Sequence, residues 1–357
     1  MLKNQLETLL KEWVDPLTEQ NLITSKSLKR LEIKDDQVQM DVVLGFPLGS
    51  LETSVREALT KLIKPVTNLA VQMNFATKIV PHVNGAHMPA LKGVKNIIAV
   101  GSGKGGVGKS TVSFHLAQAI SQLGARVGVL DADIYGPSQP SMFGLQGSKP
   151  EVVDGKFVPL QRQGLQTMSI GYLIGEAVPM IWRGPMLGKA LQQIMTDTAW
   201  DNLDYLVVDL PPGTGDIQLT LCQKIPVTGA IMVTTPQDLA LLDVRRAAEM
   251  LKKLNVPIFG FVENMSGYSC KTCGAKDAIF GEGGGQKIAE LFGEKLLVHI
   301  PLDSDIRLKT DAGQYFTEGA AFHYNHLFAE LALKVTSQMA AMPKDYSAVF
   351  PTIKIEG

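Results

Sequence analysis

The chain has 357 residues, enough for one large domain and a small one, or for two of medium size. Hydrophobic residues make up 45% of it and charged residues 19%, which predicts a sizeable core and excludes a disordered chain. The 34 Lys and Arg residues nearly balance the 35 Asp and Glu residues, so a formal net charge of -1 provides no overall field for holding nucleic acid or an anionic membrane.

The first 78 residues predict a compact α+β domain. Apolar residues recur at helical spacing from Leu2 to Trp13, and this pattern stops at Asp15-Pro16. Two strands follow over 28–33 and 38–44, then a helix over 51–62 and a third strand over 71–75. An order of helix, strand, strand, helix, strand in so short a segment is typical of a small α+β unit.

Residues 79–93 contain prolines and glycines without a clear period, and we interpret them as a linker. A second unit spans residues 94–357. Apolar runs that predict strands end at Val100, Leu130, Asp209, Val233, Val262 and about Ile300. Most are separated by segments with helical spacing, and strands buried on both faces read as continuous apolar runs. We therefore expect a mostly parallel, doubly wound α/β sheet.

A phosphate-binding loop follows the first of these strands, because residues 103–110 fit the pattern G-x-x-x-x-G-K-[ST]. The loop residues are Gly103, Lys104, Gly105, Gly106, Val107, Gly108, Lys109, Ser110 and Thr111. Glycines let backbone N–H groups surround a phosphate chain at the positive end of the next helix. Lys109 can reach the β- and γ-phosphates of ATP, and the Ser110 hydroxyl can bind Mg²⁺. A turn that binds nothing is disfavoured by the strand before the loop and the helix after it.

Lys104 is a second lysine that a simple P-loop does not need. The sequence GKGGVGKST resembles the deviant loop of ATPases such as MinD, ParA, the nitrogenase iron protein and the arsenite-pump ATPase. The resemblance implies that Lys104 reaches the nucleotide of a partner subunit, and that two subunits close around two ATP molecules. The alternative is a solvated lysine on a loop.

Two aspartates, Asp131 and Asp133, end the strand over 126–130 and would face the crevice where ligands bind. In the resembling families the second of the pair orients the attacking water, a role that falls to Asp133, while Asp131 would lie nearer the magnesium. The alternative is that both carboxylates cap the next segment.

A further acid, Asp209, ends another buried strand and is expected to hold Mg²⁺ through water. It continues into residues 210–216, LPPGTGD, whose prolines and glycines are typical of a switch that changes on hydrolysis. Asn264, after the strand over 258–262, matches the position that contacts the purine ring in related folds.

The three cysteines are Cys222, Cys270 and Cys273. Their small and odd number does not fit a disulfide framework in a chain of this length. Close cysteines in a reducing compartment tend to be metal ligands or redox groups. The first residues, MLKNQLETLLKEW, lack the features of a secretory signal, and no apolar run of about 18 residues predicts a transmembrane helix. We expect a cytoplasmic protein.

Cys270 and Cys273 form a C-x-x-C in a polar, glycine-rich loop, a spacing that lets both sulfurs reach one metal centre. Three interpretations remain open. A redox pair usually opens a helix in a thioredoxin-like unit. A zinc site wants four protein ligands. A metal or cluster shared across a dimer obtains its missing two thiolates by symmetry. Cys222 is expected to be a buried hydrophobic residue, and His323 and His326 surface or packing residues.

Taken together, the second unit resembles the Mrp-type iron–sulfur carrier ATPases over about residues 94–340. The segments DADIYGPSQPSMFG, WRGPM, DLPPGTGD and VENMSGYSCKTCG carry this resemblance. It implies slow ATP hydrolysis, a [4Fe–4S] cluster bridged between subunits of a homodimer by Cys270 and Cys273, and transfer to apoproteins, with the cluster assembly machinery as a further partner. We expect the switch after Asp209 to pass the nucleotide state to the cysteines.

The first unit resembles the MIP18-type domain that precedes some of these ATPases, through Val14-Asp15-Pro16 and its strand pattern. Some members carry a cysteine before a proline after the second strand, where this chain has Phe46-Pro47. The resemblance therefore implies partner docking and not a thiol role for this domain.

Two other functions share the loop. A positioning ATPase of the MinD or ParA kind would need a basic amphipathic tail for a membrane or a basic patch for DNA. The stretch over 327–357 has few lysines, and neither class explains the cysteines. A zinc-holding scaffold would bind ATP, hydrolyse almost none and transfer no metal.

Overall fold

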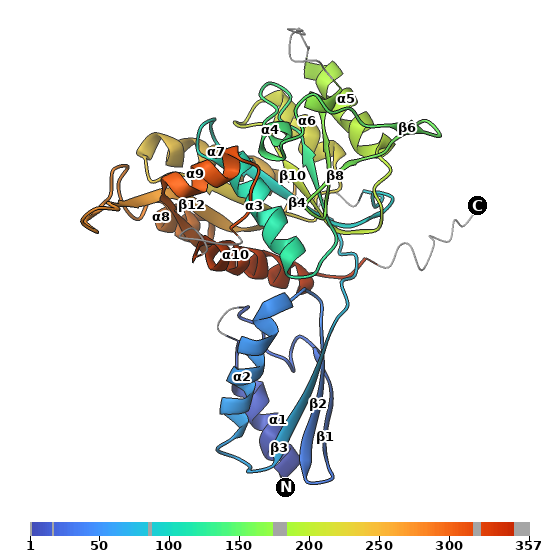
Figure 1. Cartoon of the computed structure of the whole chain (residues 1–357), viewed down its shortest axis with the longest axis vertical. Coiled ribbons are helices and arrows are strands. Elements are labelled where there is room, and N and C mark those ends of the chain that lie inside the picture. The colour runs from blue at the N-terminus through green and yellow to red at the C-terminus, as the bar shows by residue number, and fades with distance from the viewer. Residues whose placement is uncertain (1, 16–17, 85–87, 174–183, 317–322, 346–357) are drawn as a thin grey trace.

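The computed structural model of the chain describes residues 2–15, 18–84, 88–173, 184–316 and 323–345 (Figure 1). Residues 182 and 183 of the WRGPM segment lie outside them, and so does the C-terminal tail over 346–357. Among the described residues no helix has both the length and the apolar character needed to cross a membrane.

The N-terminal part of the chain is a small α+β domain, which lies below the rest of the molecule in Figure 1. Its elements are α1 (Leu2–Glu12), β1 (Leu28–Lys34), β2 (Gln37–Leu44), the 3-10 turn η1 (Gly49–Leu51), α2 (Glu52–Ile63) and β3 (Ala70–Thr77). β2 pairs antiparallel with β1 and parallel with β3. Every second residue of β2 is buried, as expected of a sheet covered on one face by helices. The predicted order of elements is confirmed.

A mostly parallel sheet forms the centre of the larger part, in the order β13-β12-β11-β4-β10-β5-β9-β8, with β14 paired to β12. Its strands are β4 (Val94–Ser102), β5 (Val127–Asp131), β8 (Leu160–Arg162), β9 (Leu165–Ser169), β10 (Leu203–Asp209), β11 (Gly229–Thr234), β12 (Ile258–Ser269), β13 (Lys276–Asp277) and β14 (Leu296–Leu302). Only β8 and β13 pair antiparallel in the described part of this sheet. The predicted fold class is therefore confirmed.

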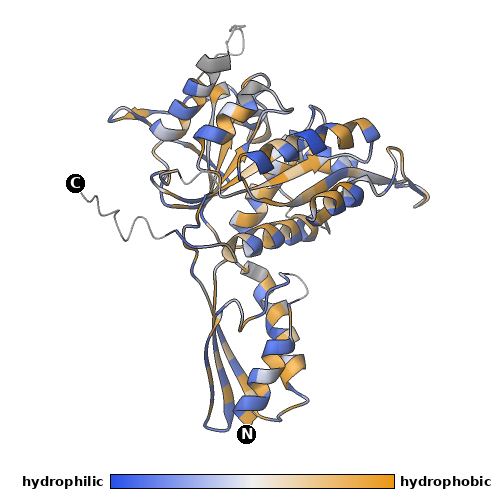
Figure 2. Ribbon diagram, turned by 180° about the vertical axis from the view of Figure 1, so that it is seen from behind, coloured by the Kyte–Doolittle hydropathy of each residue, from blue (hydrophilic) through white to orange (hydrophobic). Residues whose placement is uncertain are grey.

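Helices cover both faces of the sheet. They are α3 (Lys109–Gln122), α4 (Gln139–Met142), α5 (Gly184–Asp197), α6 (Asp216–Lys224), α7 (Asp238–Lys253), α8 (Gly284–Phe292), α9 (Ser304–Asp311) and α10 (His323–Ala340). Ile98 and Val100 of β4 pack with α3 and α10, whereas Ile97 and Ala99 pack with α5 to α8. Figure 2 shows the central strands as largely hydrophobic and the helices as two-sided, as a three-layer α/β fold requires.

Several elements did not stand out in the sequence. The hairpin of β6 (Val152–Val153) and β7 (Lys156–Phe157) and the edge strands β8 and β13 are short and exposed or partly exposed. The inner strand β9 and the turn η2 (Ile170–Tyr172) are largely buried but also short. β12 runs to Ser269, seven residues beyond the apolar run that predicted it. Its polar end is held as a strand by hydrogen bonds to β13 and β14, and no apolar pattern marks it.

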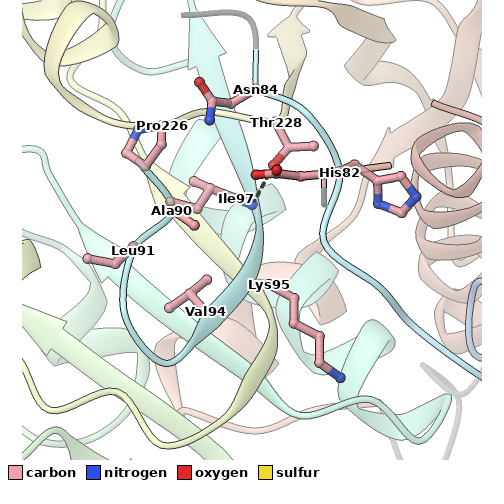
Figure 3. Close-up of a pocket in the computed structure, with 10 residues that line it drawn as sticks. His82, Asn84, Ala90, Leu91, Val94, Lys95, Ile97, Pro226 and Thr228 are labelled. Atoms are coloured by element: carbon pink, nitrogen blue, oxygen red, sulfur yellow. Dashed lines mark hydrogen bonds between the residues drawn. The ribbon is translucent and has the colours of Figure 1, made fainter. Parts of the chain in front are cut away.

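The small domain is joined to α10 by packing and hydrogen bonds. Ser337 of α10 donates to the Thr18 carbonyl at 3.4 Å, and Glu19 forms an ion pair with Lys295. The linker pairs with the chain after α10, where Val83 N lies 3.0 Å from the Pro343 carbonyl oxygen. A small pocket beside the linker is lined mainly by linker and β4 residues (Figure 3). At its wall the Ile97 amide donates a hydrogen bond to the Thr228 hydroxyl oxygen. The exact boundaries at residues 78 and 93 stay a prediction.

His115 of α3 is fully buried beneath the sheet, where its ring stacks on Phe316. Its Nε2 lies 2.7 Å from the Thr310 hydroxyl oxygen. Burial lowers the pKa of this imidazole to about 3. The folded protein therefore holds His115 in its neutral form across the mildly acidic range.

We predict that stability falls as the pH drops from about 6.5 towards 3. In this range His115 binds a proton in the unfolded chain but stays neutral in the folded one. One such proton changes the free energy of unfolding by about 1.4 kcal/mol per pH unit. His115→Gln keeps a polar partner for Thr310 and should flatten this part of the profile, measured as the denaturant midpoint against pH. Parallel profiles for the variant and the wild type would contradict the assignment.

Candidate nucleotide site and cysteine hairpin

The glycine loop lies between the end of β4 and the start of α3. Gly106 and Gly108 adopt φ values of +82° and +84°, in the left-handed region that favours glycine. Gly103 packs directly on the backbone of Asp243 and Val244 in α7, where any Cβ atom would overlap. Helix α3 begins at Lys109 without a side-chain cap. Its first N–H groups are therefore available to an anion.

Lys109 projects from this loop into a cluster of carboxylates at the edge of the sheet. Its Nζ lies 2.6 Å from Asp209 Oδ1, 3.6 Å from Asp133 Oδ2 and 3.3 Å from Ser110 Oγ. Asp209 and Asp131 are register partners at the ends of the parallel strands β10 and β5. The sheet therefore brings together the predicted residues Lys109, Ser110, Asp131, Asp133 and Asp209.

Asp131 is completely buried, and backbone and side-chain donors hold both of its oxygens. Its Oδ1 accepts from the Asp133 amide, and its Oδ2 accepts from the Gln139 amide and the Ser169 hydroxyl, each at 3.1 Å. Burial, with the charge of Asp209 as a second cause, raises the pKa of Asp131 to about 7. Burial also raises the pKa of Asp133 against the pull of Lys109. The cluster thus carries more negative charge than one lysine balances.

A magnesium ion fits this donor set. Carboxylate and hydroxyl oxygens are the ligands that Mg²⁺ prefers, and Asp209, Asp131 and Ser110 present them in one place. The raised pKa of Asp131, caused by burial and by the neighbouring charge of Asp209, shows that a further negative charge is costly at this place. A cation in the cluster would favour the ionised form of Asp131. Asp209 and Ser110 could hold the ion directly or through water, with Asp131 behind them.

Lys104 lies at the outer side of the loop and is half-buried. Its Nζ lies 3.5 Å from Oε1 of Gln237, the residue before α7. Two leucines of α7, the helix that begins directly after Gln237, are exposed: Leu239 at 72% and Leu242 at 47%. This face of the nucleotide site therefore combines a cation with apolar side chains that no part of the described chain covers.

Asn264 lies against the loop backbone. Its Nδ2 donates to the Val107 carbonyl at 2.8 Å and sits where a Cβ on Gly108 would be. The structure thus brings Asn264 to the nucleotide site as a support of the loop. Its contact with the purine ring stays a prediction.

Cys270 and Cys273 lie at the tip of a hairpin made by β12 and β13. The Cys270 amide donates to the Ala275 carbonyl at 2.9 Å, and Gly274 closes the turn at φ +72°. Cys270 is half-exposed and Cys273 exposed. Hydrogen bonds from the backbone of Cys273 and Thr272 lower the pKa of Cys270. Among the described residues no group of three His, Cys, Asp or Glu could hold a metal ion, so one chain offers two thiols.

Lys271 fixes this hairpin to the N-terminus of α9. Its Nζ lies 2.6 Å from Asp305 Oδ1 and 3.3 Å from Asp303 Oδ1. Asp303 also caps α9 through the Asp305 amide. This tether could not be predicted from the sequence, because a lysine and two aspartates more than 30 residues apart form no local pattern.

The remaining predicted residues have structural places. Cys222 is buried on α6, as expected, and burial raises the pKa of its thiol to about 12. His326 is exposed on α10, and the His323 side chain lies outside the described residues. A residue that sequence reasoning missed is Gln139, whose Nε2 lies 3.1 Å from Asp209 Oδ2. A lone glutamine between prolines matches no motif.

Comparison with known proteins identifies relatives of both parts. The family described as NUBPL iron-transfer P-loop NTPase matches residues 93–336, and the family described as iron-sulfur cluster assembly protein matches residues 3–72. The iron-sulfur cluster carrier protein of Haemophilus influenzae is 44% identical over 94% of this chain and 92% of its own length. The Escherichia coli protein of the same name is 42% identical over 95% and 92%.

Solved structures agree on the fold. A nucleotide-binding protein from Archaeoglobus fulgidus in complex with ADP is 38% identical, with a TM-score of 0.57 over 65% of this chain and 92% of that one. The cell division ATPase MinD of Pyrococcus furiosus is 22% identical, with a TM-score of 0.52 over 68% of this chain and 99% of that one. The second similarity concerns the fold alone.

We predict that Gly108→Ala weakens nucleotide binding at least tenfold. A side chain at this φ costs about 1–2 kcal/mol, and the new methyl group would also push the Asn264 amide off the loop. Calorimetric titration with ADP measures the loss. Gly136→Ala is the matched control, since its methyl group would meet no atom within 4 Å. Equal affinities for the two variants would show that the loop does not need this conformation.

Proposed function

The chain belongs to the NUBPL iron-transfer P-loop NTPase family, and on that premise we propose that it is an ATPase that carries an iron–sulfur cluster and hands it to apoproteins. The cargo is a [4Fe–4S] cluster on Cys270 and Cys273, bridged across a homodimer. The cysteine hairpin carries this proposal: it offers two accessible thiols, without a third ligand in the described part of the chain.

Cluster binding follows from the chemistry of these thiols. Such a cluster takes four cysteine thiolates, and a twofold axis through the hairpins would supply two from each copy. The lowered pKa of Cys270, caused by hydrogen bonds from the hairpin backbone, favours the thiolate that binds iron. At an exposed tip, thiolates of an acceptor protein can reach the iron and replace those of the carrier one by one.

The nucleotide site supports ATP binding and slow hydrolysis. The loop and the uncapped start of α3 bind the phosphates, and Lys109 exchanges the Asp209 carboxylate for β- and γ-phosphate oxygens. Magnesium, when bound by Ser110 and Asp209, neutralises phosphate charge. Asp133 orients the attacking water and accepts its proton, a role that its raised pKa suits, burial being the chief cause.

Lys104 completes the site of the second copy. Within the described residues of one chain its ammonium makes a weak contact with Gln237, at 3.5 Å, and it can leave that contact at little cost. The exposed Leu239 and Leu242 of α7 would be covered by the facing subunit. A phosphate of the partner's ATP offers Lys104 a full negative charge instead of a neutral amide.

The nucleotide state would reach the cysteines through packed elements. The Gly213 amide of the switch segment donates to the Ser102 carbonyl at 3.0 Å, beside the glycine loop. On another route, Gln139 of α4 contacts Asp209, α4 packs on α9, and the start of α9 holds Lys271 of the hairpin. Loss of the γ-phosphate can therefore move the hairpin and open the bridge.

The small domain is proposed as the docking unit for acceptor apoproteins and for the cluster assembly machinery. Its match to the iron-sulfur cluster assembly family and its lack of cysteine support a binding role without thiol chemistry. We place the whole cycle in the cytoplasm, where thiols stay reduced.

We predict that anaerobic reconstitution with iron and sulfide loads about four irons per dimer, and that Cys270→Ala with Cys273→Ala abolishes this uptake. The iron count and the visible absorption spectrum measure it. Cys222→Ala is the matched control, because its buried thiol cannot reach a cluster at the hairpin. Zinc uptake without iron would favour the scaffold function, and iron retained by the double variant would refute the site.

Subunit exchange between two inactive variants tests whether Lys104 acts across the dimer. Lys104→Ala and Asp133→Asn should each lose ATP hydrolysis when assayed alone. Mixed and re-equilibrated, they form hybrid dimers in which one site combines an intact Asp133 with an intact Lys104 from the other copy. Hydrolysis by the mixture should then recover towards half of the wild-type rate per hybrid. A mixture as inactive as its components would mean that Lys104 acts within its own chain.

A further inference from the structure

Gln139 is fully buried at the start of α4, between the glycine loop and the carboxylate cluster. Its side-chain Nε2 donates at 3.1 Å to Asp209 Oδ2 and at 3.1 Å to the Ser110 carbonyl oxygen. Both neighbours of this nitrogen are acceptors, which fixes the orientation of the amide. The same residue's backbone amide holds Asp131 independently of its side chain.

The Asp209 carboxylate is thereby held on both oxygens. Lys109 and the Ser113 hydroxyl bind Oδ1, at 2.6 and 2.9 Å, and Gln139 binds Oδ2. When Lys109 turns to phosphate, Ser113 and Gln139 remain to fix the plane of the carboxylate. A carboxylate that binds a metal depends on such hydrogen bonds for its orientation.

The other end of the Gln139 amide is its Oε1 oxygen. Oε1 is buried and accepts no hydrogen bond from any described residue. A buried acceptor left unsatisfied costs about 1–3 kcal/mol, so its persistence at this place needs a reason. A water in the magnesium shell would supply the missing donor, since it carries two polarised O–H groups.

We propose that Gln139 is a positioning residue of the magnesium–nucleotide site, which holds Asp209 through Nε2 and accepts from a magnesium-bound water through Oε1. This inference rests on the proposed ATPase function and on Asp209 as a magnesium ligand. It assigns a role in metal affinity to a side chain that touches neither phosphate nor the attacking water. Gln139 should therefore influence how tightly Mg²⁺ joins the complex more than how the nucleotide itself binds.

The test is the Mg²⁺ dependence of ATP binding, measured by calorimetry on the full chain. Gln139→Met keeps the length of the side chain and removes both amide contacts, and Gln139→Asn keeps the amide but falls one methylene short. We expect both to raise the Mg²⁺ concentration for half-maximal tightening about tenfold, as loss of outer-shell partners does. Binding in EDTA should be unchanged. Gln146→Met, an exposed glutamine seven residues on, is the matched control.

An unchanged Mg²⁺ requirement in both Gln139 variants would overturn the inference. So would an equal loss of affinity with and without Mg²⁺, because that pattern describes damage to packing. If the wild type itself showed no Mg²⁺-dependent tightening, the proposed ATPase site would fail along with the inference. A failure confined to the variants leaves the proposed function standing.

Discussion

One ammonium group among two buried carboxylates and a third, partly buried one sets the conditions for the nucleotide site. Lys109 lies 2.6 Å from Asp209 and 3.6 Å from Asp133, and Asp131 is buried behind them. The parallel strands β5 and β10 end side by side, so the sheet itself forces these charges together. One lysine does not balance them, and the pKa of Asp131 rises to about 7, mainly through burial. The site therefore favours whatever brings further positive charge.

The rest of the site can be understood as the means of exchanging partners around this cluster. Glycines at positive φ leave α3 uncapped for phosphate, and Asn264 supports the loop from outside. When Lys109 binds phosphate, its ion pair with Asp209 is lost. Asp209 can then bind a metal, and the hydrogen bonds from Ser113 and Gln139 still hold its carboxylate. α4 also packs on α9, and Asp305 of α9 binds Lys271 of the cysteine hairpin. A change of contacts at the nucleotide site can therefore be passed to the hairpin through these two helices.

Sequence reasoning predicted the features that depend on a local pattern of residues. Continuous apolar runs predicted the parallel strands. The loop motif pointed to Lys109 and Ser110 because all of its residues lie in one short stretch of sequence. It failed where contacts join distant residues. Lys271 meets Asp303 and Asp305 across more than 30 residues. Gln139 has no neighbours in sequence that explain it, and the polar end of β12 is a strand only because β13 and β14 pair with it.

The central claim is that the protein carries a cluster in order to give it away, and a transfer assay tests this directly. The loaded dimer would be mixed anaerobically with an apo-ferredoxin that takes one [4Fe–4S] cluster, in the presence of an iron chelator, and the acceptor's circular dichroism followed. We predict that the acceptor fills while the chelator stays colourless, at a rate that changes with ATP. Iron appearing in the chelator before the acceptor, or no transfer at all, would contradict the account.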